Sequence, residues 1–116
     1  MTAKTIEVFP GPEFEILSED QRSNLFQQEF TIDKNNNRMA IQLNEEVKNN
    51  LDSIITGPVI PGTVQLTPAG KLIVLMKDCQ TTGGYPRVLH LSEKSLNIIS
   101  QKLMGESVNF SLKKNA

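Results

Sequence analysis

Polar side chains and paired glycines are concentrated in one short segment, residues 80–86. It holds an amide, two hydroxyls and a phenol beside two glycines: Gln80, Thr81, Thr82, Gly83, Gly84 and Tyr85. Glycine has no Cβ, so a ligand or another chain can approach this backbone closely, and the polar groups can then orient it. The same residues also fit a polar hairpin that turns at the two glycines. The lysine and following helix of a Walker-type phosphate loop are missing.

Four further side chains are candidates for chemistry. Lys77 and Asp78 follow the apolar run 72–76, where a β-barrel presents polar groups at its rim. Lys77 can neutralise a phosphate and Asp78 can act as a base, or the two can simply fix the loop through an ion pair or an Asx-turn. Arg38 can hold a carboxylate or phosphate, or remain a solvated surface arginine. Gln65 places an amide inside a strand, either facing a groove or bridging backbone groups.

The composition excludes several classes of function. Twelve basic residues against thirteen acidic ones give a formal net charge of -1, and aromatic residues make up 5%, so neither a basic field nor base-stacking surfaces for nucleic acid are expected. Cys79 is the only cysteine, which excludes an intrachain disulfide and a thiolate metal cluster. No metal site is predicted. Cys79 and His90 lack catalytic partners at a suitable spacing, so we expect both to be structural.

The hydrophobic pattern predicts short strands. They are expected at 5–9, 29–33, 38–43, 63–66, 72–76, 88–91 and 107–112. Turns are expected at 10–12, 34–37, 57–58, 61–62 and 68–70, and a loop or short helix at 44–50. Met39 is expected to share one strand face with Ile41 and Leu43. Many short strands must close to protect their edges, so the sequence predicts a mainly β, closed barrel.

Two short helices complete the predicted fold. Ser18 and Gln21 form a capping-box pattern for a helix that ends near Gln28 and buries Leu25 and Phe26. Ser92 predicts the start of a second helix. Its inner face is expected to carry Leu96, Ile99 and Leu103, and Gly105 is expected to terminate it in the left-handed conformation. The lone thiol and the apolar run of only five residues at 72–76 predict a cytoplasmic protein without a membrane span.

Two longer motifs resemble a known family. Residues 60–70 are Ile-Pro-Gly-Thr-Val-Gln-Leu-Thr-Pro-Ala-Gly, and residues 73–86 are Ile-Val-Leu-Met-Lys-Asp-Cys-Gln-Thr-Thr-Gly-Gly-Tyr-Pro. Together they resemble the KipA-like, or allophanate hydrolase subunit 2, family. Residues 8–13, 37–39 and 105–110 support the resemblance, which covers nearly the whole chain. It implies a cyclophilin-like closed β-barrel, with residues 1–116 as a single domain that corresponds to the C-terminal half of a two-half protein.

The family includes one of the subunits of an ATP-dependent 5-oxoprolinase. The resemblance therefore implies opening of the cyclic amide of 5-oxoproline to glutamate, with ATP bound by the full complex. Partners implied are the N-terminal half and a companion KipI-like subunit, and the isolated domain is expected to be inactive. The implied catalytic residues are Lys77, Asp78 and Gln80. The implied substrate-binding residues are Arg38, Gln65, Thr81, Thr82, Gly83, Gly84 and Tyr85.

Two alternatives remain open at this point. One is a carboxyltransferase of the urea carboxylase type, with biotin carried on another domain because no Met-Lys-Met attachment motif is present. The other is a regulatory module that binds a partner protein. The chain also differs from the family pattern at Ala40 and Gln42, where the family has a glycine and a second arginine. Gln42 supplies neither the charge nor the bidentate fork of that arginine.

Overall fold

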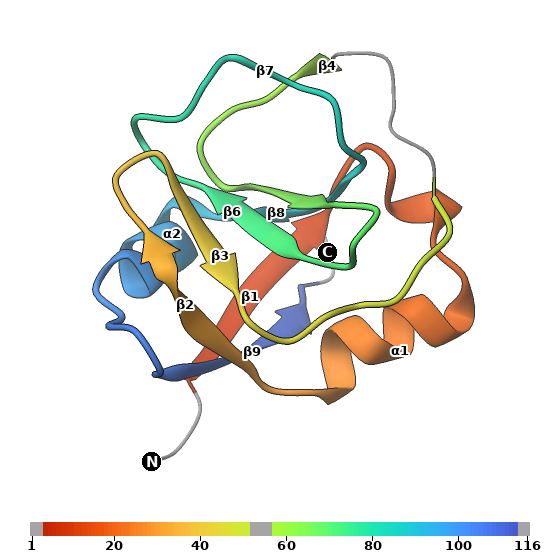
Figure 1. Ribbon diagram of the computed structural model, residues 1–116, viewed down its shortest axis with the longest axis horizontal. Coiled ribbons are helices and arrows are strands. Elements are labelled where there is room, and N and C mark those ends of the chain that lie inside the picture. The colour runs from red at the N-terminus through yellow and green to blue at the C-terminus, as the bar shows by residue number, and fades with distance from the viewer. Residues whose placement is uncertain (1–3, 52–56, 114–116) are drawn as a thin grey trace.

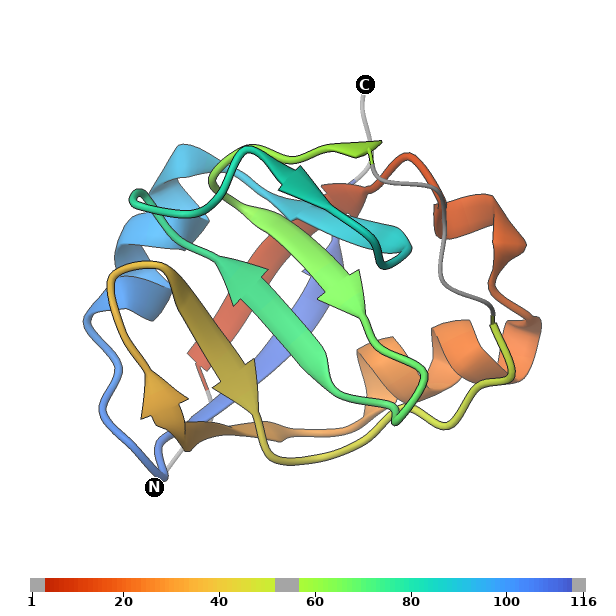
Figure 2. The same ribbon diagram turned by 45° about the horizontal axis from the view of Figure 1, so that its top comes forward.

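Most of the structure is a closed β-barrel. The structure, a computed structural model, describes residues 4–51 and 57–113. The barrel strands are β1 Lys4–Pro10, β2 Phe30–Asn36, β3 Ala40–Leu43, β5 Thr63–Leu66, β6 Leu72–Leu75, β8 Arg87–Leu91 and β9 Ser107–Leu112. They close in the order β1, β8, β5, β6, β3, β2, β9 (Figures 1 and 2). All neighbours are antiparallel except β1 and β9, which run parallel. The predicted mainly β closed barrel with two short helices is confirmed.

The barrel interior is filled by alternate residues of each strand, as the period of two requires. Ile6 and Val8 of β1 are fully buried, as is Val108 of β9. The rings of Phe30 and Phe110 meet at a centroid distance of 5.5 Å. One apolar core therefore holds strands from both ends of the chain.

Two helices lie against the outside of the barrel. Helix α1, Glu19–Gln27, begins at the predicted capping box: Gln21 N donates to Ser18 Oγ at 3.1 Å, and Ser18 N donates to Gln21 Oε1 at 2.8 Å. Leu25 is buried and Phe26 is half-buried. Helix α2, Glu93–Ser100, is capped by Ser92. A 3-10 turn, Phe14–Ile16, precedes α1. In the described residues, no helix is long and apolar enough to cross a membrane.

Several predicted boundaries were wrong. Helix α2 ends at Ser100, so Leu103 lies outside it and is exposed. Gly105 is left-handed, with φ 86°, but it forms the turn into β9 rather than the helix terminus. The predicted turn at Gly57–Pro58 is instead strand β4, which pairs with β7, Thr82–Gly83. Local turn propensity was overridden there by pairing with a distant segment.

The connection between β2 and β3 also differs from the prediction. Residues 34–36 belong to β2, so the turn covers residues 37–39 and not the predicted 34–37. No described residue other than glycine has a positive φ. Asn37 Oδ1 instead accepts from Met39 N at 2.8 Å and from Ala40 N at 3.0 Å, and Met39 is exposed. Residues 44–50 are a loop without helix.

Candidate functional site

Three predicted site residues line one hollow. It lies between the β2–β3 turn, the turn after β6, and helix α2, and has a volume of about 440 Å³. We call it the β2–β3 hollow. Its lining residues are Asn36, Asn37, Arg38, Ile41, Met76, Lys77, Asp78, Leu96, Asn97, Ser100 and Lys102. The structure thus brings together Arg38, Lys77 and Asp78, which are 40 residues apart at most.

Arg38 and Asp78 form an exposed ion pair at this hollow. Arg38 Nε donates to Asp78 Oδ2 at 3.2 Å, and the two side chains are 91% and 54% exposed. The backbones are also joined, because Asp78 N donates to Arg38 O at 3.1 Å. The other N–H donors of Arg38 make no hydrogen bond to the described residues. An exposed pair of this kind contributes about 0–1 kcal/mol to stability, so Arg38 can turn to an anionic ligand at little cost.

Gln65 lies on the outer face of β5, opposite the core-facing Val64 and Leu66. Its side chain is covered by Gly83 of β7, and the residue is only 2% exposed. A Cβ built on Gly83 would overlap Gln65 Nε2. Glycine at position 83 therefore leaves room for the close approach of this amide, which a larger residue would displace.

The amide of Gln65 is also unsatisfied. Its Nε2 is buried and has no hydrogen-bond partner among the described residues. A buried donor without a partner costs about 1–3 kcal/mol. No hydrogen bond within the described residues explains this buried amide, which β7 covers.

The segment 80–86 does not turn at its glycines. It crosses outside the barrel and pairs with β4, with Thr82 opposite Pro58 and Gly83 opposite Gly57. The hairpin interpretation is therefore wrong, since β6 and β8 do not pair with each other. Gln80, Thr81, Thr82 and Tyr85 are exposed, Gly84 is half-buried and Gly83 is buried. None of them lines the β2–β3 hollow. The segment begins two residues after Asp78 of that hollow and contains β7, the strand that covers Gln65.

A mostly buried arginine–carboxylate pair was not predicted from the sequence. Arg87 Nε donates to Glu13 Oε1 at 2.7 Å and Arg87 Nη2 to Glu13 Oε2 at 2.8 Å, with both side chains 18% exposed. Arg87 N also donates to Glu13 Oε1, and Nη1 donates to Pro58 O at 2.8 Å. The pair therefore fixes β4 and the start of β8. Through them it also holds the two-stranded sheet of β4 and β7, whose Gly83 covers Gln65. The only sign of this pair in the sequence is that each of the two residues directly follows a proline.

Three further titratable groups near these elements have shifted pKa values. Hydrogen bonding to Arg87 holds the pKa of Glu13 below its usual value, although burial opposes the shift. Burial raises the pKa of the Cys79 thiol and lowers the pKa of His90. Both residues thus favour their neutral forms, as a structural role requires. Within the described ranges, no three metal-binding side chains come together.

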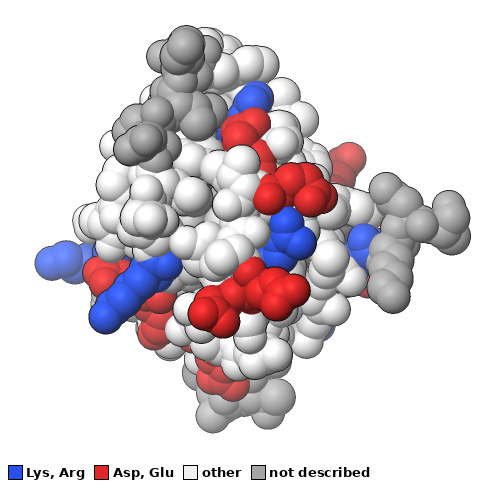
Figure 3. All heavy atoms as spheres, turned by 90° about the vertical axis from the view of Figure 1, so that its right-hand side faces the viewer, with Lys and Arg blue, Asp and Glu red and all other residues white. Residues whose placement is uncertain are grey.

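Charges on the face that carries α1 are mixed. Acidic and basic groups lie in small neighbouring clusters with uncharged surface between them (Figure 3). On α1, Arg22 Nη2 lies 3.4 Å from Oε2 of the acidic residue Glu15. This face therefore presents no extended field of one sign.

Comparison with known proteins identifies the family. A family model described as carboxyltransferase domain, subdomain A and B, matches residues 1–112. The chain belongs to this family. It is 31% identical over 107 residues to a 5-oxoprolinase subunit of Escherichia coli, covering 90% of this chain and 34% of that protein. The corresponding 5-oxoprolinase subunit of Haemophilus influenzae is 29% identical over 108 residues, covering 90% and 35%. The chain thus spans about a third of the length of these relatives.

Solved structures share the fold. The urea carboxylase of Kluyveromyces lactis superposes with a TM-score of 0.88 at 18% identity, covering 98% of this chain and 11% of that one. The urea amidolyase of the same yeast gives a TM-score of 0.87 at 17% identity, covering 98% and 8%. The family predicted from the motifs at 60–70 and 73–86 is confirmed.

Proposed function

We propose that this chain is part of an ATP-dependent 5-oxoprolinase, in which it forms one side of the site that opens the cyclic amide of 5-oxoproline to glutamate. The proposal is supported by the two 5-oxoprolinase relatives, each similar over 90% of the chain. The observation that carries it is the β2–β3 hollow, where Arg38, Lys77 and Lys102 stand against the single carboxylate of Asp78. A hollow with excess positive charge suits a substrate that is itself a carboxylate and is activated by phosphate.

We assign the cations of the hollow to charge neutralisation. Arg38 and Lys77 would hold the substrate carboxylate or the transferred phosphate, and Asp78 would orient Arg38 through its existing hydrogen bond. Asp78 is also placed to accept a proton if Arg38 turns to the ligand. Gln42 is not among the residues that line the hollow, so the loss of the family's second arginine leaves these three groups in place.

The exposed groups of the 80–86 segment are assigned to substrate orientation. Gln80, Thr81, Thr82 and Tyr85 present an amide, two hydroxyls and a phenol to solvent between the hollow and Gln65. These residues do not line the hollow themselves. We therefore propose that a second protein surface faces them and completes a groove shared with the hollow. We therefore assign the opposing wall to a second barrel of the same family or to a companion KipI-like subunit.

ATP supplies the phosphoryl group that activates the amide oxygen when it is bound by the full complex. The residues here fit one phosphoryl group rather than a whole nucleotide. Both α-helices begin at a serine whose side chain already caps the first turn, and neither follows a glycine-rich loop. We therefore place the remainder of the nucleotide on companion subunits. Separately, we propose that the protein is cytoplasmic.

The test is turnover in the complex reconstituted with its companion subunits. Gln80→Ala combined with Tyr85→Phe should reduce 5-oxoproline-dependent phosphate release by about a hundredfold, because misplaced substrate loses most of its orientation. Gln27→Ala, an exposed glutamine on α1, is the matched control and should leave turnover unchanged. Unchanged turnover in the double variant would eliminate the assignment.

The same assay separates the alternatives. A carboxyltransferase of the urea carboxylase type would release no phosphate with 5-oxoproline and would instead require a biotin-carrying domain. A regulatory module would bind its partner protein without affinity for 5-oxoproline or ATP. Either result would replace the hydrolytic proposal.

A further inference from the structure

Two large apolar side chains are held in solvent by the turn between α2 and β9. Leu103 is 72% exposed and Met104 is 66% exposed. Leu103 N donates to Glu106 Oε1 at 2.7 Å, and Glu106 N donates to Leu103 O at 3.0 Å. Gly105 N donates to Ile32 O at 2.9 Å. These bonds fix the turn on the barrel, so the exposure of both apolar side chains is built into the backbone. We call residues 102–106 the Leu103 turn.

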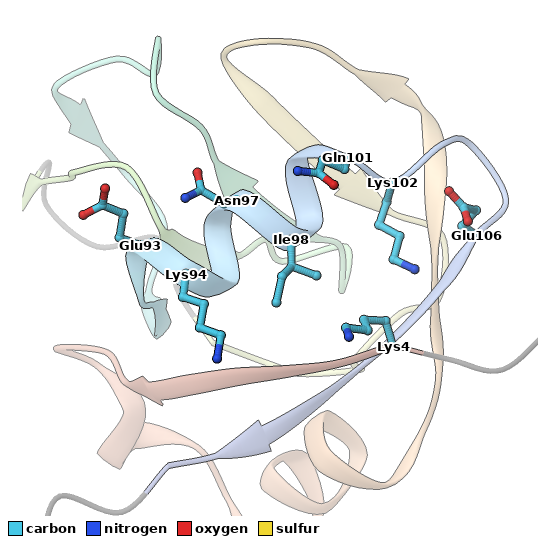
Figure 4. A pocket seen from close by; sticks show the side chains of 8 residues that line it. All are labelled: Lys4, Glu93, Lys94, Asn97, Ile98, Gln101, Lys102 and Glu106. Carbon is cyan, nitrogen blue, oxygen red and sulfur yellow. The ribbon is translucent and has the colours of Figure 1, made fainter.

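Beside this turn lies a second hollow, larger than the first. It has a volume of about 770 Å³ and lies between α2, the start of β1 and the Leu103 turn. Figure 4 shows the side chains of Lys4, Lys94 and Lys102 pointing toward a common space in front of Ile98. Three separate elements therefore contribute amines to one broad surface, which we call the α2 hollow.

The three amines of the α2 hollow have no carboxylate partner among the described residues. None of them lies within 4.0 Å of a carboxylate in that part of the chain. Glu106 already accepts the Leu103 amide hydrogen bond, and the side chain of Glu93 points away from the lysines (Figure 4). Three such cations around a hollow whose only apolar lining residue is Ile98 attract an anionic ligand.

We propose that the α2 hollow and the Leu103 turn form one docking surface for an acidic segment of a partner protein. Carboxylates of that segment would face Lys4, Lys94 and Lys102, and its apolar side chains would cover Leu103 and Met104. A protein segment fits better than a small ligand, because small-molecule sites enclose most of the ligand whereas this surface is broad and open. Exposed apolar side chains bordered by charge are typical of protein interfaces.

The proposal goes beyond the catalytic assignment, and its test is kept separate from it. Lys102 lines both hollows, so the test uses Lys94, which lines only the α2 hollow. The ¹⁵N-labelled chain is titrated with a short peptide of alternating glutamate and leucine, and its amide shifts are followed by NMR. Shifts should appear in α2 and the Leu103 turn, and binding should weaken as salt is raised.

Matched variants separate charge from apolar contact. Lys94→Glu should weaken peptide binding about tenfold, whereas Lys34→Glu, an equal charge change on an exposed residue of β2, should change it less than about twofold. Leu103→Ser with Met104→Ser should also weaken binding about tenfold while leaving the melting temperature unchanged, since both residues are exposed. Turnover in the reconstituted complex is measured beside each titration, because a catalytic failure alone would leave the peptide binding intact.

Three results would overturn the proposal. The peptide fails to bind, it shifts amides outside this surface, or tripolyphosphate saturates the lysines without competing with the peptide. The third result would show that the lysines belong to a small-anion site.

Discussion

Two of the arginine–carboxylate pairs among the described residues, Arg87–Glu13 and Arg38–Asp78, differ in almost every physical respect. Arg87 and Glu13 meet through two short side-chain bonds and are mostly buried. Arg38 and Asp78 share one longer bond and are mostly exposed. The first pair joins three separate segments. The second joins two neighbouring turns that the backbone hydrogen bond from Asp78 N to Arg38 O already connects.

The difference separates a structural pair from a candidate ligand site. Arg87 cannot leave Glu13 without abandoning a half-buried charge, so the pair acts as part of the fold. Arg38 loses little when it leaves Asp78, because water replaces the bond. Chemically similar residues are thus assigned opposite roles by burial and geometry. Each prediction below tests one side of this comparison.

Removing the buried pair should have the largest effect on stability. Arg87→Ala should lower the free energy of unfolding by about 3 kcal/mol, because it leaves Glu13 half-buried without its partner and frees Pro58 O. Urea unfolding followed by circular dichroism measures the change. A loss below about 0.5 kcal/mol would show that this pair is no different from an exposed one.

The close contact under β7 should give the next largest effect. Gly83→Ala should cost about 1 kcal/mol, because its Cβ displaces the Gln65 amide and lies 3.3 Å from Val59 Cγ1. The amide is the flexible end of a side chain, so truncating it should relieve the clash. In the double variant with Gln65→Ala, the free energy of unfolding should therefore recover part of what Gly83→Ala alone loses. Losses that simply add in the double variant would contradict the contact between the two residues.

The buried pair should also shape stability at acid pH. Because the pKa of Glu13 is below its ordinary value of 4.5 in the folded protein, its contribution is complete above that value and is lost as the pH falls through the lower folded pKa. Glu13→Gln should therefore flatten the acid limb of the stability curve. Part of the slope should remain because of Asp33: burial alone would raise its pKa, but the hydrogen bond from Asn35 N and the charge of Lys71 together lower it. Identical acid limbs would mean that Glu13 does not titrate differently on folding.

The unsatisfied amide of Gln65 predicts a small gain. Gln65→Met should raise the free energy of unfolding by about 1 kcal/mol, because a buried donor without a partner is replaced by an apolar group of similar size. The same variant should lower turnover in the reconstituted complex if the amide contacts substrate. A clear loss of stability would indicate that the amide already has a partner.

Sequence reasoning predicted the closed barrel because alternation and turn residues act locally. It placed Ser18 and Ser92 at the helix starts correctly for the same reason. It missed β4 and the Glu13–Arg87 pair, since both depend on contacts between residues far apart in the chain. It extended the apolar face of α2 to Leu103, where spacing alone does not reveal that the helix has ended.

The candidate site was predictable only in part. Arg38, Lys77 and Asp78 meet in one hollow, but no pattern in the sequence showed that the segment 80–86 would lie outside it. That segment is placed by pairing between Gly83 and Gly57, and two-residue strands leave almost no periodic signal.

The most direct test of the central assignment measures turnover and stability together for Arg38→Ala. In the reconstituted complex, 5-oxoproline-dependent phosphate release should fall about a hundredfold, while the free energy of unfolding of the chain changes by less than about 0.5 kcal/mol. Lys34→Ala serves as the exposed control. Turnover equal to that of the unmodified protein would contradict the account, since Arg38 would then be only a solvated side chain.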